Sequence, residues 1–238
     1  MTAIRAGLPC RDQIYCRSSD ACAEYADAWY CYSCHKQFYK RIKLHSQKCV
    51  VQKDDYIVEL PPSCTTVLPK SALLYLADRF ITPSHVEQYR IVYNTDFHSL
   101  IFPFVDENDN LIAYYERGLT KKTHYYAGKH KLLYWATAPV PGSVIVLVED
   151  IFSAIRVGQF LPCAALCTSS VGAKKLEILE LNPRKVILWY DPDDAGQTGM
   201  LKDFIEFSNY VPTERILSLL DPKMHTNNEI ENYLAAVI

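Results

Sequence analysis

The sequence predicts an α/β fold with a parallel-stranded sheet, preceded by a small cysteine-rich segment that depends on a metal. Short apolar runs alternate with helical stretches in the second half of the chain, at 144–149, 152–160, 163–168, 172–181, 185–191 and 195–208. Continuous apolar strands that alternate with helices indicate a parallel sheet covered on both faces. The 238 residues, 49% hydrophobic and 22% charged, suffice for one large or two small globular domains.

The cysteines are concentrated at the start of the chain, where seven of the nine lie before residue 65. The first ten residues lack the apolar run of a secretory signal, and no stretch reaches the roughly 18 apolar residues of a membrane helix. We therefore expect a cytoplasmic protein without membrane contact, whose thiols stay reduced. Because the first 38 residues contain few aliphatic side chains, metal binding rather than disulfide formation is the favoured cause of the cluster.

Charge divides the chain in the same way. Up to Lys53 there are 9 basic and 4 acidic residues, a net charge of +5, and after it there are 16 basic and 23 acidic residues, a net charge of −7. The basic head is suited to an anionic partner, and the acidic body needs carboxylates for another purpose, such as metal binding.

The middle of the chain mixes helical and strand patterns. Two helical patterns, at 71–80 and 83–90, come first. Two strand patterns follow, at 100–105 and 111–117, and the turn-forming cluster 106–110 lies between them. The segment before them contains several prolines and reads as a linker. We predict a metal-binding head, a linker, a mixed α+β segment and a parallel-sheet domain, at 1–50, 51–70, 71–140 and 141–238.

Two of the apolar runs end in an acidic residue. Glu149 closes the first run, Asp191 closes the third, and Asp193 follows at once. Ligands of open parallel sheets bind beyond the carboxyl ends of the strands, and carboxylates there suit Mg²⁺ and phosphate chemistry. The alternative is that these acids only begin or cap helices. Two acidic strand ends together favour the metal site.

These strand ends resemble a Toprim domain, which is shared by primases, topoisomerases, recombination proteins and some nucleases. The resemblance lies in the segments 146–154, 165–170 and 186–199. It implies that Glu149 acts in acid/base or metal-related work, and that Asp191 and Asp193 hold Mg²⁺, for which Mn²⁺ could substitute. The chain departs from the family at Asp150, where Gly is usual, and at Ser153, where an acid is common. Either change could weaken or relocate a second metal.

The cysteine cluster resembles the zinc ribbon that opens phage and bacterial DNA primases. The strongest part of the match is the pair Cys31-x-x-Cys34. The resemblance implies a structural Zn²⁺ held by four thiolates, from Cys10, Cys16, Cys31 and Cys34. The spacing of Cys10 and Cys16 is wider than the family's, and Cys22 is an alternative to Cys10.

The segment before the Toprim-like part also resembles that of primases. The family's groove-lining basic residues would fall on Arg117, Lys121 and Lys122, where they would neutralise phosphates opposite the metal. The alternative for each is a solvated surface charge. The histidines at positions 45, 98, 124 and 130 are scattered and do not have the spacing of metal ligands. We do not expect them to act at the site.

The order of zinc ribbon, mixed segment and Toprim-like domain resembles the DNA primases of phage type. This resemblance implies synthesis of short RNA primers on a single-stranded DNA template from ribonucleoside triphosphates, in the host cytoplasm if the protein is phage-encoded. No Walker A loop occurs in the sequence, so a separate replicative helicase is the expected partner. The alternatives are a Toprim nuclease and a non-catalytic, zinc-dependent single-stranded-DNA-binding recombination mediator.

Overall fold

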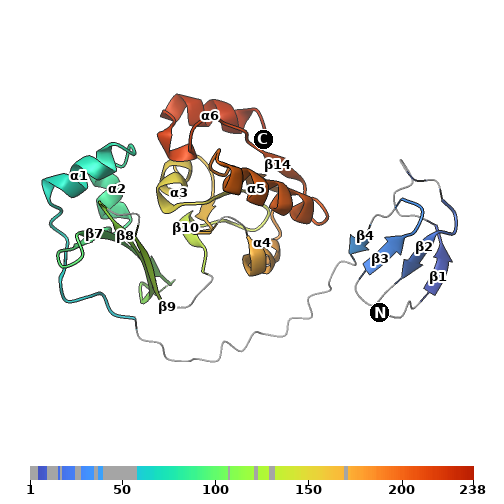
Figure 1. The fold of residues 1–238 in the computed structure, drawn as a ribbon, viewed down its shortest axis with the longest axis horizontal. Helices are drawn as coiled ribbons and strands as arrows, with labels where there is room; N and C mark the ends of the chain where they lie inside the picture. The colour runs from blue at the N-terminus through green and yellow to red at the C-terminus, as the bar shows by residue number, and fades with distance from the viewer. Residues whose placement is uncertain are drawn as a thin grey trace. The chain divides into compact units, whose positions relative to one another are not determined.

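The chain forms two compact units, Met1–Gln52 and Lys53–Ile238 (Figure 1). The computed structural model describes residues 5–9, 16, 18–24, 28–34, 37–39, 58–106, 108–120, 123–128, 132–168 and 171–238. None of the helices in these ranges is long and apolar enough to cross a membrane.

The first unit contains a four-stranded antiparallel sheet. Its strands follow one another in chain order: β1 (Arg5–Leu8), β2 (Cys22–Glu24), β3 (Ala28–Cys31) and β4 (Gln37–Tyr39). Cys22 pairs with Cys31 across β2 and β3. Buried Cys16, Cys22 and Cys31 form the centre of a small apolar cluster, so sulfur rather than hydrocarbon supplies most of its interior.

The second unit begins with a five-stranded antiparallel sheet and two helices. The strands lie in chain order, β5 (Cys64–Thr65), β6 (Val92–Asn94), β7 (Ser99–Val105), β8 (Leu111–Gly118) and β9 (His124–Gly128), with α1 (Lys70–Ala77) and α2 (Pro83–Gln88) between β5 and β6. The predicted hairpin joins β7 and β8, which pair antiparallel. Asp106 stabilises its turn, because the backbone N–H groups of Asn108 and Asn110 both donate to Asp106 Oδ1 at 2.9 Å.

Part of the predicted linker differs from expectation. Val58 is buried against the antiparallel sheet, where it packs with Val92 and Ile101. Cys64 and Thr65 pair with β6 as an edge strand. Residues 58–69 thus belong to the body, because Val58 and Leu60 pack on this sheet and Leu68 packs against the main core. The local pattern does not indicate this packing, because the prolines dominate it.

The second half of this unit contains the predicted parallel sheet, which begins before the expected boundary at 141 because β10 pairs with β12. Its elements are β10 (Tyr134–Thr137), β11 (Val144–Val148), α3 (Ile151–Val157), β12 (Cys163–Ala165), η1 (Gly172–Lys174), α4 (Lys175–Glu180), β13 (Lys185–Leu188), α5 (Asp194–Phe207), β14 (Thr213–Arg215), η2 (Pro222–Met224) and α6 (Asn227–Ala235). The strand order is β10-β12-β11-β13-β14. All neighbours are parallel except β10, which pairs antiparallel with β12.

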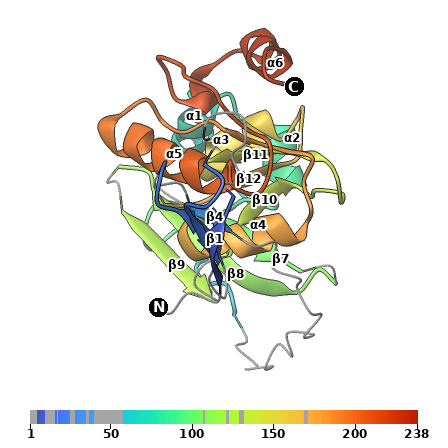
Figure 2. The same cartoon turned by 90° about the vertical axis from the view of Figure 1, so that its right-hand side faces the viewer.

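Helices cover both faces of this sheet, as the sequence predicts. On one face Val146 packs with Ile155 of α3 and Ile230 of α6. On the other face Leu147 packs with Met200 of α5. In the turned view α6 and α4 lie on opposite sides of β11 and β12 (Figure 2). Because both faces are covered, every residue of β11 is buried and the strand is a continuous apolar run. The α/β class and the parallel sheet are confirmed.

Candidate active site and cysteine cluster

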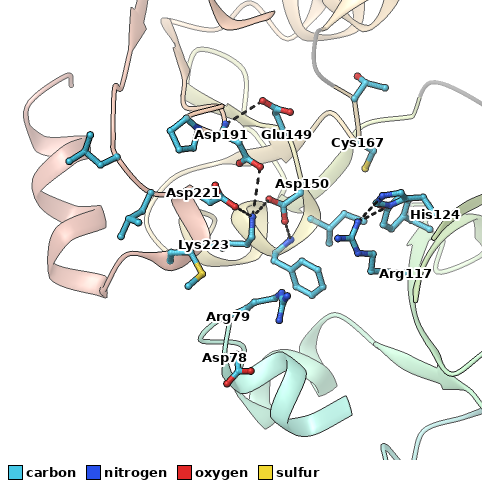
Figure 3. A pocket seen from close by; sticks show the side chains of 18 residues that line it. Asp78, Arg79, Arg117, His124, Glu149, Asp150, Cys167, Asp191, Asp221 and Lys223 are labelled. Carbon is cyan, nitrogen blue, oxygen red and sulfur yellow. Dashed lines mark hydrogen bonds and ion pairs between the residues drawn. The ribbon is translucent and has the colours of Figure 1, made fainter. Parts of the chain in front are cut away.

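The main candidate site is a pocket of about 750 Å³ at the carboxyl ends of the parallel strands. The chain passes from β11 to β12 on one side and then crosses to β13 on the other. This reversal leaves a crevice where ligands of open parallel sheets bind. The loops after all four parallel strands contribute to the pocket, and the opposite wall comes from the turn after α1, from β8 and from β9 (Figure 3).

Glu149 and Asp191 meet in this pocket. Glu149 follows β11 and Asp191 lies beyond β13, its neighbour in the sheet. The backbone N–H of Asp191 donates to Glu149 Oε1 at 3.3 Å. Burial and the neighbouring Asp191 raise the pKa of Glu149 to about 7. Burial, Asp150 and Asp221 raise the pKa of Asp191 to about 7, although Lys223 opposes the rise. The two carboxylates therefore favour a bound cation or proton.

The donor set at this point fits a divalent cation. Asp191 Oδ1 is buried and accepts no hydrogen bond within the described part of the chain. A buried acceptor without a partner is costly, and a hard cation would satisfy it. Mg²⁺ typically takes one or two protein carboxylates and fills its other positions with water and phosphate oxygens. Glu149 and Asp191 supply that number.

Asp193 lies beside this pair in a different role. It precedes α5 as the N-cap, and its Oδ1 accepts a 2.7 Å hydrogen bond from the N–H of Gly196. Its charge raises the pKa of both Glu149 and Asp191. Among the described residues, the carboxylates of Glu149, Asp191 and Asp193 do not form a group as tight as the cysteine cluster. Direct metal ligation by Asp193 stays a prediction.

Gly196 allows α5 to approach the two acids. A Cβ on this glycine would clash with Glu149 Oε1 and with the backbone oxygen of Asp191. Both atoms would be far closer to it than van der Waals contact allows. Position 196 must lack a side chain for the strand ends and the helix to come together as they do.

Asp150 and Ser153, the two departures from the Toprim pattern, contact each other. Asp150 is the N-cap of α3 and accepts from the backbone N–H groups of Phe152 and Ser153. The hydroxyl of fully buried Ser153 donates to Asp150 Oδ2 at 2.7 Å. Ser153 therefore positions Asp150, whose carboxylate lines the pocket.

Two residues on the acidic wall were not predicted from the sequence: Asp221, which precedes η2, and Lys223, which lies in it. Lys223 Nζ is 3.0 Å from Asp150 Oδ2 and 3.9 Å from Asp191 Oδ2, and it also donates to Asp221 Oδ2 (Figure 3). Only the order of the strands places these two residues in the pocket. Strand β14 lies next to β13, so the loop after β14 reaches the same edge of the sheet as Asp191.

The wall opposite the acids is basic and aromatic. Arg117 of β8 contacts His124 of β9, with Nη1 2.9 Å from the ring nitrogens, and both line the pocket with Arg79 and Tyr115 (Figure 3). Arg117 Nε is buried and has no hydrogen-bond partner within the described ranges. The expectation that His124 does not act at the site is thus at odds with its position. His124 reaches the pocket because it pairs with Arg117 across β8 and β9. Pairing these two strands in the predicted sheet is the step that could have indicated His124.

Two of the predicted basic residues, Lys121 and Lys122, lie outside the described residues. So does Cys10 of the predicted zinc ligands. The structure brings Arg117 to the same pocket as Glu149 and Asp191.

Three of the predicted zinc ligands come together in the first unit. The sulfur atoms of Cys16, Cys31 and Cys34 all lie within 4.8 Å of one another. Cys16 Sγ and Cys31 Sγ are 3.8 Å apart. Two thiolates bound at about 2.3 Å to one tetrahedral Zn²⁺ are separated by about 3.8 Å. The cluster therefore fits zinc, and Cys22, though buried nearby, is not a member of the close group.

Comparisons with known proteins give a consistent fold. No protein-family model matches the sequence. No curated protein matches it either. The primase fragment of the bacteriophage T7 primase-helicase protein is similar over 100% of both chains, with a TM-score of 0.55 and 17% sequence identity. The chain has the fold of DnaG-type and phage primases.

Two further structures agree with this primase fold in the body of the chain. A DnaG catalytic core is similar over 71% of this chain and 73% of its own, with a TM-score of 0.57 and 15% identity. The E. coli primase catalytic core is similar over 70% and 71%, with a TM-score of 0.55 and 17% identity. These similarities support the primase fold, and the bounds of the predicted head, mixed segment and Toprim-like domain stay predictions.

Replacing Gly196 by Ala is expected to damage the acidic site. Alanine in a helix is normally up to about 1 kcal/mol more favourable than glycine, so lower stability would report the clash with Glu149 and Asp191. We expect a lower melting temperature and weaker Mn²⁺ binding by calorimetry. The control Ala195→Gly, one position away, should lower stability slightly and leave Mn²⁺ affinity unchanged. A Gly196→Ala protein as stable as the wild type, with unchanged Mn²⁺ affinity, would contradict this account.

The raised pKa values of Glu149 and Asp191 predict a pH dependence of stability when no divalent cation is added. Between about pH 4 and pH 7 the folded chain retains protons that the unfolded chain has released, so this pair lowers the free energy of unfolding as pH rises. Glu149→Gln should show a smaller fall in urea midpoint between pH 5 and pH 7.5 than the wild type. Asp96→Asn, at an exposed position, should behave as the wild type. Equal falls in all three proteins would refute the assignment.

The cysteine geometry predicts that the purified chain contains one zinc ion. Cys31→Ser should remove most of it, because the replaced thiolate is a fully buried member of the close group. Cys64→Ser is the matched control, since Cys64 belongs to the antiparallel sheet of the body and should retain the zinc. Elemental analysis of both proteins decides, and an unchanged zinc content in Cys31→Ser would exclude this site.

Proposed function

We propose that the chain is a DNA primase that synthesises short RNA primers on single-stranded DNA by metal-dependent nucleotidyl transfer. The observation that carries the proposal is one pocket with acidic Glu149 and Asp191 on one side and basic Arg117 on the other (Figure 3). An acidic side binds a divalent cation, and a basic side binds the phosphates that the cation leaves exposed. The primase fold supports the same conclusion.

The reaction in this pocket joins two nucleotides. The 3′ oxygen of the primer forms a bond to the α-phosphorus of the incoming ribonucleoside triphosphate, and the α–β phosphoanhydride bond breaks to release pyrophosphate. The proton of the 3′-hydroxyl passes to water, and the negative charge of Glu149 beside the reacting atoms favours its departure.

Glu149 and Asp191 would hold Mg²⁺, with Asp193 adding negative charge beside them. The ion would neutralise charge on the triphosphate and on the pyrophosphate that leaves. Gly196 keeps the two acids together, and the hydrogen bond from Asp191 N–H to Glu149 orients the Glu149 carboxylate.

Arg117 would bind the triphosphate from the opposite wall. Its guanidinium can donate to two phosphate oxygens at once, which fixes both the position and the orientation of the nucleotide. Arg79 lines the same pocket and stacks on Tyr75 with its guanidinium carbon 3.6 Å from the ring centre, so it adds a second, positioned charge. Lys121 and Lys122 are proposed to extend this basic wall along the template.

The template is proposed to be single-stranded DNA. Two of the similar structures are a DnaG primase catalytic domain bound to ssDNA, with a TM-score of 0.55, and T7 primase domains bound to an RNA/DNA hybrid, with a TM-score of 0.52. The net charge of +5 up to Lys53 supports a role of the zinc unit in template binding. A separate replicative helicase remains the predicted partner.

Substitutions at the acidic pair test the proposal. With single-stranded DNA, labelled ribonucleotides and Mg²⁺, the wild type should make short RNA products. Asp191→Asn and Glu149→Gln should each lower this synthesis by roughly a hundredfold or more, because each removes a charge at the reacting phosphates. DNA binding should change little. The control Asp96→Asn should retain full synthesis.

The same assay separates the alternative functions. Cut DNA without RNA products would indicate a Toprim nuclease. DNA binding without any product would indicate a non-catalytic mediator. Full synthesis by Asp191→Asn would contradict the role of the acidic pair even if the wild type is a primase.

A further inference from the structure

Lys223 lies within the acidic end of the pocket. Its side chain is only 14% exposed, and its ammonium contacts Asp150 and Asp221 and lies 3.9 Å from Asp191 Oδ2 (Figure 3). A lysine surrounded by three carboxylates, and largely removed from solvent, is a fixed positive charge rather than a solvated surface group.

The protein holds this ammonium in place from several elements. Asp150 is fixed at the start of α3 by hydrogen bonds from two backbone N–H groups and from Ser153. Asp221 immediately precedes η2, whose second residue is Lys223. The ammonium of Lys223 is paired with the carboxylates of Asp150 and Asp221, with Asp191 beside them, so the protein supplies the negative charge that an ammonium needs at this partly buried position.

Asp191 has different surroundings at its two carboxylate oxygens. Its Oδ2 points toward Lys223, whereas its Oδ1 is buried without a hydrogen-bond partner among the described residues. Figure 3 shows Glu149 and Lys223 on opposite sides of Asp191. One cation position next to Asp191 is thus filled by the protein itself, whereas Oδ1 has neither a cation nor a donor beside it among the described residues.

We propose that Lys223 is a built-in cation that fills the place of a second divalent ion among Asp150, Asp191 and Asp221, so that the chain binds a single divalent ion in this pocket. The inference rests on the proposed function for the identity of the first ion. Asp150 and Ser153 belong to the same arrangement, because together they form the side of the ammonium site that faces α3.

The number of divalent ions bound by zinc-loaded protein tests this proposal, with Mn²⁺ as the probe. Mn²⁺ prefers oxygen ligands and does not compete for thiolates. The wild type should bind one Mn²⁺ by calorimetry and by the loss of the free-ion electron paramagnetic resonance signal. Lys223→Met should bind two, because the three carboxylates lose their counter-ion. Lys223→Arg, which keeps the charge, should bind one.

Two controls separate a cation role from a purely structural one. Lys175→Met removes a comparable lysine, paired with Glu206 at 3.0 Å outside the pocket, and should leave the count at one. Asp221→Asn combined with Lys223→Met should return the count to one, because the second ion would lose a ligand. A structural lysine would change stability in these proteins without changing the number of ions.

Each outcome decides the proposal. Two Mn²⁺ ions in the wild type, or no more ions in Lys223→Met than in the wild type, would overturn it. If Lys223→Met does not fold, Lys223→Gln replaces it with the same expected count of two. No Mn²⁺ in the wild type but one in Lys223→Met would support the built-in cation and contradict the metal site of the proposed function.

Discussion

The repulsion among carboxylates at the carboxyl ends of the parallel strands is the constraint on which this site depends. Glu149, Asp150, Asp191 and Asp221 line one side of a single pocket, partly shielded from water. Like charges at such distances destabilise one another in proportion to their burial. The fold tolerates them because a lysine neutralises part of the charge and because the pKa values of Glu149 and Asp191 rise.

The surrounding structure holds these mutually repelling carboxylates in place. Strand β11 is buried along its whole length, so its end, and with it Glu149, has a fixed position. Pairing with β13 brings Asp191 alongside, and Gly196 leaves room for both acids beneath the start of α5. A rigid sheet that positions charged loops at one edge is a common way to keep reacting groups in place.

The two units depend on different sources of stability. The body packs apolar side chains on both faces of the parallel sheet. The first unit has a cluster built largely from cysteine, and the separation of Cys16 and Cys31 suits a tetrahedral metal. A small sheet of this kind draws its folding free energy from metal binding more than from burial. The cysteine cluster of the head is thus suited to stabilisation by a metal, whereas a charge balance supports the site in the body.

The sequence by itself determined the features that depend on neighbours along the chain. Alternating apolar runs and helices predict the parallel sheet, and the acids at the ends of two runs predict that Glu149 and Asp191 meet. Cysteine spacing predicts the close group of Cys31 and Cys34, but the linker prediction fails at 58–69, where packing overrides the local proline signal.

Only the tertiary structure decided which distant groups complete the site. Lys223 is 73 residues from Asp150 in sequence, and it reaches that acid because β14 pairs with β13 and returns the chain to the same edge. His124 reaches the pocket through its pairing with Arg117 across β8 and β9. Asp193, placed by sequence beside Asp191, directs one oxygen to the start of α5. The contacts of Lys223 and His124 follow from strand order, which local residue patterns do not encode.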